Sequence, residues 1–128
     1  MTVLSSLIIG GGGVADAVFQ VERLATADAV NYTIARTAGS AFSFTAGNIM
    51  TCDEAGDYVL NFDLWGPVSG NISLYKNGAL SESRLMLLNA FNSISFAASA
   101  IAGDTFELRN TSGSTSTPAP FVLNWIKV

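Results

Sequence analysis

One stretch of this sequence decides the fold, AGDYVLNFDLW, which runs from Ala55 to Trp65. If the stretch is a strand, one of its faces carries four apolar side chains, those of Tyr58, Leu60, Phe62 and Leu64. The opposite face carries a more polar set, made up of Val59, Asn61, Asp63 and Trp65. This sustained period of two residues predicts a β-strand that places one face against a core.

The same alternation recurs on both sides of this stretch. Shorter alternating segments lie at residues 30–34, 42–45, 72–75, 93–97 and 106–109. Turn residues separate them, among them Asn77-Gly78, a dipeptide typical of tight hairpins. Because no long helical repeat is convincing, the sequence predicts an all-β domain, either a sandwich or a barrel.

Three further segments need separate interpretation. Residues 14–25 fit either a helical stripe of valines or a strand in which Phe19 and Val21 alternate. Residues 85–88 form a continuous apolar run, which suits either a fully buried strand or a short helix. The last segment, Phe121 to Val128, is apolar on both faces, as is typical of a central strand that is covered on both sides.

The chain divides into an N-terminal arm, residues 1–27, and a β-sandwich domain, residues 28–128. Four consecutive glycines, Gly10 to Gly13, predict a flexible joint behind an apolar tip. An exposed apolar tip is an aggregation hazard, so we expect it to lie on a partner surface or to add a strand to a neighbour's sheet edge. The anchoring residues would be Leu4, Leu7, Ile8 and Ile9.

The composition indicates burial against other chains. Apolar residues make up 49% of the chain and charged residues 12%, whereas a typical soluble domain carries about 25% charged residues. In addition, the residues opposite the core-facing ones are mostly Ser, Thr, Asn and Ala. These small uncharged residues suit a sheet that packs on a neighbouring subunit, so we expect a homo-oligomer.

The charge pattern excludes several partners. The net charge is −4 and the six basic residues are scattered, so we expect no nucleic acid, which needs a basic stripe. For the same reason we expect no binding to anionic membrane surfaces. The apolar tip is too short to span a bilayer and lacks the positive flank of a secretory signal, which predicts a mature, untargeted product.

The residue types also argue against an enzyme. The chain has no histidine and a single cysteine, Cys52, which excludes the usual cysteine–histidine and serine–histidine–acid arrangements and any internal disulfide. We expect no cofactor. Asp53, Glu54 and Asp57 form the only weak candidate for a metal site, because calcium favours clustered carboxylates, although an ordinary polar hairpin loop explains them better.

Three motifs resemble those of the globular head of complement's first component, a family that shares its ten-stranded jelly roll with tumour necrosis factor. They are AGDYVLNFDLW, NISLYKNG at residues 71–78 and AGDTFEL at residues 102–108. The matching positions are Gly56, Tyr58, Leu60, Phe62, Leu74, Asn77, Gly78, Gly103, Asp104, Phe106 and Leu108. The resemblance covers about residues 29–128 and implies an antiparallel jelly-roll β-sandwich.

The resemblance also implies a trimer, because the family forms compact trimers with the final strands near the three-fold axis. The oligomer interface would then include Val122, Trp125, Ile126 and Val128. The chain lacks a collagen-like stalk, and its short arm is similar to the arms of decoration, fibre or knob proteins of bacteriophage and virus particles. That similarity implies a capsid or other assembly protein as partner and a location in the virion, or otherwise outside the cell.

The leading hypothesis is therefore a non-enzymatic structural protein, a trimeric module of a larger assembly. The alternative is a carbohydrate- or receptor-binding module that uses loops at one end of the sandwich, residues 110–120 and 81–84. Aromatic side chains that could stack on sugar rings in this alternative are Tyr32, Trp65, Tyr75 and Trp125.

Overall fold

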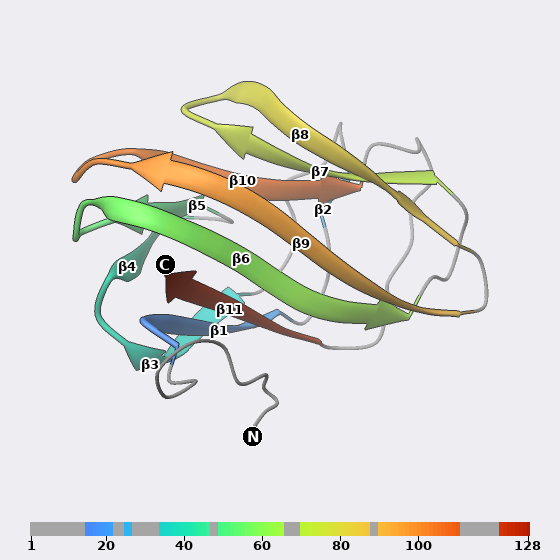
Figure 1. Ribbon diagram of the computed structural model, residues 1–128, viewed down its shortest axis with the longest axis horizontal. Coiled ribbons are helices and arrows are strands. Elements are labelled where there is room, and N and C mark those ends of the chain that lie inside the picture. Colours follow the sequence, from blue (N-terminus) through green and yellow to red (C-terminus); the bar gives the residue numbers. More distant parts are fainter. Residues whose placement is uncertain are drawn as a thin grey trace.

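The computed structural model describes residues 15–21, 25–26, 34–46, 49–65, 70–87, 90–110 and 121–128. All the regular elements among these residues are β-strands, which pack as two sheets (Figure 1). In the part of the chain so described, no helix is long and apolar enough to cross a membrane. The prediction of an all-β antiparallel sandwich is confirmed.

The two sheets are built from strands that are distant in sequence. One has five strands in the spatial order β3 (Ile34–Gly39), β1 (Ala17–Val21), β11 (Phe121–Lys127), β6 (Gly56–Trp65) and β9 (Phe91–Ala100). The other has the order β4 (Phe42–Ala46), β5 (Ile49–Cys52), β10 (Thr105–Asn110), β7 (Gly70–Lys76) and β8 (Ala79–Met86), with β2 (Ala25–Thr26) beside β10. Every strand pairing is antiparallel except that of β2 with β10.

Strand β6 is the decisive stretch of the sequence, and it behaves as its alternation predicts. Tyr58, Leu60 and Phe62 are buried in the core. β6 pairs with β9 along its whole length, from Gly56 opposite Ala100 to Trp65 opposite Phe91, and its other side pairs with β11. Figure 1 shows β9, β6 and β11 side by side in one layer.

The predicted boundary between an arm of residues 1–27 and a domain that starts at residue 28 is wrong. β1 lies between β3 and β11, and its residues Ala17, Phe19 and Val21 are in the core. The strand interpretation of this segment holds because those three residues recur with a period of two. The four predicted anchoring residues, from Leu4 to Ile9, lie outside the described residues.

Residues 85–87, the described part of the segment 85–88, form neither the fully buried strand nor the short helix that the sequence left open. β8 ends at Met86, which is buried, whereas Leu85 and Leu87 are 65% and 55% exposed. β8 is an edge strand, and of its eight residues Met86 alone is buried. Residues 81–84, predicted as a loop, lie within this strand.

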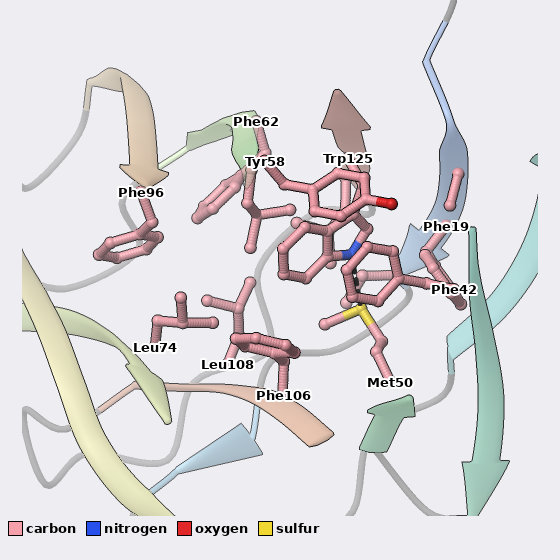
Figure 2. Close-up of a cluster of buried hydrophobic side chains, with 14 of the residues drawn as sticks. Phe19, Phe42, Met50, Tyr58, Phe62, Leu74, Phe96, Phe106, Leu108 and Trp125 are labelled. Carbon is pink, nitrogen blue, oxygen red and sulfur yellow. Dashed lines mark hydrogen bonds between the residues drawn. The ribbon is translucent and has the colours of Figure 1, made fainter. Parts of the chain in front are cut away.

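Trp125 occupies the centre of the core, between the sheets (Figure 2). Its ring stacks on that of Phe42 from the other sheet, with centroids 4.0 Å apart and planes inclined by 13°. Phe106 and Tyr58 meet the indole edge to face, at 5.1 and 6.2 Å. The buried indole N–H has a hydrogen-bond partner, because Nε1 donates to Met50 Sδ at 3.4 Å. The tryptophan therefore joins strands of both sheets.

Two motif residues hold neighbouring turns together. Asn77 and Gly78 have positive φ values, 52° and 84°, as a tight hairpin between β7 and β8 requires. The Asn77 side chain donates to Asp104 Oδ1 at 3.1 Å and accepts from the backbone N–H of Thr105 at 2.8 Å. Asp104 Oδ2 accepts from the backbone N–H of Ile101 at 3.0 Å. The β7–β8 and β9–β10 turns are thus one hydrogen-bonded unit.

This unit predicts a pH-dependent contribution to stability. The hydrogen bond from the Ile101 backbone, aided by Asn77 and the nearby Lys76, lowers the pKa of Asp104. A lowered pKa means stabilisation that is present above the unfolded value of about 3.9 and is lost as the pH falls through the folded pKa. We expect Asp104→Asn to lower the urea midpoint at pH 7, and the difference from the unsubstituted chain to shrink below about pH 4. A difference that stays constant with pH would contradict this assignment.

Candidate oligomer interface

The outer side of the five-stranded sheet is the candidate site. In β11 the side chains of Phe121, Leu123 and Trp125 point into the core, so the alternate residues point outward. Strand register places further residues on the same side, because directly opposite residues share a face. We call this surface the β11 face and define it by Val18, Gln20, Val59, Asn61, Ser95, Ala97, Val122, Asn124 and Ile126.

The β11 face is arranged in rows that cross the sheet. One row joins Ile126, Val59 and Ala97, and the next joins Asn124, Asn61 and Ser95. Gln20 lies opposite Val122 and Val18 lies opposite Asn124. None of these side chains carries a charge, so a second uncharged surface could cover them without burying a charge, provided that the amides of Gln20, Asn61 and Asn124 find hydrogen-bond partners there.

Asp57 and Asp63 lie on the same side of β6, in the rows next to these two. Ser99 Oγ donates to Asp57 Oδ1 at 2.6 Å at one end of the β6–β9 ladder. Ser93 Oγ donates to Asp63 Oδ1 at 2.6 Å near the other. The carboxylates are thereby tied to the sheet at the border of the β11 face, and its centre is uncharged.

The outer side of the six-stranded sheet has a different chemistry. Arg109 Nε donates to Glu107 Oε1 at 2.8 Å, and the Arg109 guanidinium lies 4.3 Å from the centre of the Tyr75 ring. Glu107 is only 5% exposed. A charged pair thus stands in the middle of this sheet's outer side, whereas the β11 face has none. The contrast makes the β11 face the better candidate for contact between subunits.

The structure places the four predicted interface residues in different environments. Val122 lies on the β11 face and is 41% exposed, and Val128, just beyond the end of β11, is 73% exposed. Ile126 also lies on the β11 face, although only 5% of it is exposed. Trp125 has no exposed surface and belongs to the core of the single chain, so its assignment to an interface is wrong. A strand that is apolar on both faces does not reveal which face turns inward.

The sequence predicted Val122 and Ile126 of the β11 face but not its other residues. The omitted positions are Val18, Gln20, Val59, Asn61, Ser95, Ala97 and Asn124. A signal for them was present, because small uncharged residues stand opposite the core-facing ones. Without the strand order, however, nothing in the sequence shows that β1, β11, β6 and β9 lie next to one another.

Two of the three acidic residues considered for a metal site, Glu54 and Asp57, have different hydrogen-bond partners. Glu54 Oε2 accepts from Lys127 Nζ at 2.6 Å, a bond that raises the pKa of Lys127, while Asp57 accepts from Ser99. Asp53 is exposed. Among the described residues no group of three potential ligands is close enough to hold a metal ion.

Cys52 is part of the core and not a reactive thiol. The residue is fully buried, and its Sγ–H donates to the backbone carbonyl of Glu54 at 3.2 Å. Burial raises the pKa of this thiol. A raised pKa keeps the thiol protonated at neutral pH, and the protonated form is not a nucleophile. Tyr58 donates to the same carbonyl at 2.5 Å, and burial raises its pKa as well.

The aromatic residues of the carbohydrate-binding alternative do not gather on one surface. Trp125 is buried, and one face of the Tyr75 ring is covered by Arg109. Tyr32 and the side chain of Trp65 lie outside the described residues, as do residues 111–120. The described part of the chain therefore supplies no open aromatic platform from this set.

Comparison with known proteins identifies the fold. No protein-family model matches the chain, and no curated protein matches it in sequence. Among solved structures, the globular domain of zebrafish complement 1qA protein superposes with a TM-score of 0.60 at 14% identity, over 90% of this chain and 98% of that one. Rabbit GITRL gives 0.57 at 13% identity, over 88% and 93%. Pika GITRL gives 0.52 at 13% identity, over 87% and 96%.

These similarities confirm the resemblance to complement and tumour necrosis factor in its structural part. The chain has the jelly-roll fold shared by the complement globular head and tumour necrosis factor-like proteins. Identities of this size establish the fold alone.

The position of Trp125 yields a test of core against surface. We expect Trp125→Ala to lower the free energy of unfolding by about 3–5 kcal/mol, because it leaves a cavity between the sheets. Leu80→Ala is the control, since Leu80 is 59% exposed and should change stability by less than about 0.5 kcal/mol. Urea unfolding followed by far-ultraviolet circular dichroism, which reports the backbone and does not need the tryptophan, measures the stability of both variants. Equal effects of the two substitutions would show that Trp125 is not the centre of the core.

Proposed function

We propose that this protein is a non-enzymatic structural subunit, a trimeric jelly-roll module whose copies pack through the β11 face. The observation that carries the proposal is the uncharged surface that extends over four adjacent strands, from Val18 on β1 to Ala97 on β9. A chain with 12% charged residues gains solubility when such a surface is covered by another subunit. The resemblance to the complement head supports a trimer as the oligomeric state.

The larger assembly that we propose is a bacteriophage or virus particle, in which the trimer would be a capsid decoration or fibre protein. Two features support this role. A β-sandwich with a core centred on Trp125 is a sturdy building block, and the apolar segment from Leu4 to Ile9 offers a means of attaching it to a partner surface or to the sheet edge of a neighbouring chain. The partner would then be a capsid or other assembly protein, and the location the virion or otherwise the extracellular space.

The absence of catalysis belongs to the same proposal. The sequence contains no histidine, and the one thiol, Cys52, is buried and held protonated. A carbohydrate-binding role has less support, because Tyr75 is covered by Arg109 and Trp125 is in the core.

A charge placed on the β11 face tests the proposal. We expect Val122→Glu to dissociate the oligomer at least tenfold more readily, because an unpaired carboxylate would be buried at the subunit contact. In the isolated subunit the same side chain would be half-exposed and harmless, since Val122 is 41% exposed. Light scattering over a dilution series measures the effect.

The matched control is Ile101→Glu. Ile101 is 67% exposed and follows β9 at the turn before β10, away from the β11 face. The unsubstituted chain and this control should both have three times the mass of one chain. A monomer in the unsubstituted chain, or a Val122→Glu variant as associated as the control, would refute packing through the β11 face.

A further inference from the structure

Strand β9 forms an edge of the five-stranded sheet and carries no charge of its own, although Lys76 of β7 caps the carbonyl of Ser99 near its end. In the described part of the chain it pairs with β6 alone. It has ten residues, FNSISFAASA, and none is charged or proline. Exposed edges are normally protected by charges, prolines or short length, because their backbone groups invite another strand. A long uncharged edge of this kind is expected to be covered in the working assembly.

The other three edge strands are protected. β8 carries Glu82 and Arg84, which pair at 3.3 Å, and β3 carries Arg36. β4 is uncharged but has only five residues. The comparison singles out β9 among the sheet edges.

The outward direction of the β9 backbone can be derived from two hydrogen bonds. Ser99 of β9 lies directly opposite Asp57 of β6. Lys76 Nζ donates to the carbonyl of Ser99 at 2.8 Å, and the backbone N–H of Val128 donates to the carbonyl of Asp57 at 2.9 Å. The carbonyl of Asp57 therefore points to β11 and that of Ser99 away from β6. In an antiparallel strand the N–H and C=O groups of one residue point to the same side, and this direction recurs at every second residue. The N–H and C=O groups of Ser93, Ser95 and Ala97 therefore also point away from β6.

A pocket of about 440 Å³ lies beside this edge. Arg84 and Leu85 of β8 line one side, and residues 91–95 of β9 line the other. Leu85 and Phe91 are 65% and 76% exposed. The charge of Arg84 is already compensated by Glu82. The pocket is also lined by the polar residues Asn92, Ser93 and Ser95, so an added strand along β9 could place an apolar side chain against Leu85 and Phe91 while its backbone bonds to the edge.

We infer that the occupant of the β9 edge is the segment Thr2–Ile9 of a neighbouring copy. This inference rests on the proposed function, in which copies of the chain assemble. The segment TVLSSLII has eight residues without charge or proline, so it matches the uncharged edge in length and chemistry. It also supplies leucine and isoleucine side chains for the pocket.

The neighbour, and not the same chain, supplies the segment for a steric reason. A strand added beside β9 would lie four strand spacings, or about 19 Å, from β1, because β11, β6 and β9 stand between them. Residues 10–16 could span that distance, since seven extended residues reach about 23 Å. The direct path, however, runs over the β11 face, which is covered by another subunit in the proposed oligomer. A neighbour's segment can reach the edge from outside.

Disulfide trapping between two differently substituted chains tests the inference. One chain carries Ser5→Cys or Ser6→Cys, which point to opposite faces of an added strand, and the co-expressed chain carries Ser95→Cys and a mass tag. Opposite residues on paired strands bring their Cβ atoms within about 5.5 Å, close enough for a disulfide with a small adjustment. We expect one of the two arm variants to give a mixed disulfide dimer on a non-reducing gel. Native Cys52 does not interfere, because it is buried.

The matched control moves the acceptor cysteine to the opposite edge of the same sheet. Thr37→Cys lies on β3 and is exposed, and we expect at least tenfold less mixed dimer with it. Equal yields with Thr37→Cys, or no mixed dimer with either arm variant, would overturn the inference. A disulfide within one chain carrying both cysteines would show that the chain covers its own edge.

The failure of this inference can be told apart from that of the proposed function. Light scattering of the same variants under reducing conditions reports the mass of the oligomer. A trimer without the mixed disulfide would refute only the role of Thr2–Ile9, whereas a monomer would refute the assembly on which that role rests.

Discussion

The stacking of Trp125 on Phe42 is the contact on which the rest of the structure depends. β11 lies between β1 and β6 in one sheet, and Phe42 belongs to β4 in the other. The same indole meets Phe106 edge to face and donates to Met50. One side chain therefore ties three strands of the second sheet to the centre of the first, and aromatic packing of this extent contributes a large share of the buried area.

The inward direction of Trp125 sets the character of the opposite surface. Because side chains alternate along β11, Val122, Asn124 and Ile126 must point outward once the indole points inward. The register with β6 then brings Val59 and Asn61 next to them. A surface of uncharged side chains is thus a direct consequence of the packing of the core, and it is also the surface that we propose for subunit contact.

Several of the charged residues that the structure describes hold ends and turns of the chain. Lys127 binds Glu54, and Lys76 lies 3.7 Å from Asp104 while it also caps a carbonyl of β9. Gly56 takes part in the first of these arrangements, because a Cβ atom there would lie 2.6 Å from Lys127 Cε. The motif glycine and the motif residues Asn77 and Asp104 thereby have structural roles, which leaves the faces and the β9 edge for contact with other chains.

The sequence by itself determined which residues share a face and where the chain turns. The alternation around Tyr58, Leu60 and Phe62 and the dipeptide Asn77-Gly78 are local properties, and local steric and hydrophobic periodicity suffices to predict them. The tertiary structure alone decided which face of β11 is the interior and that β1 belongs to the sandwich. Those outcomes depend on contacts between segments far apart in the chain, such as Trp125 with Phe42, and no local pattern contains them.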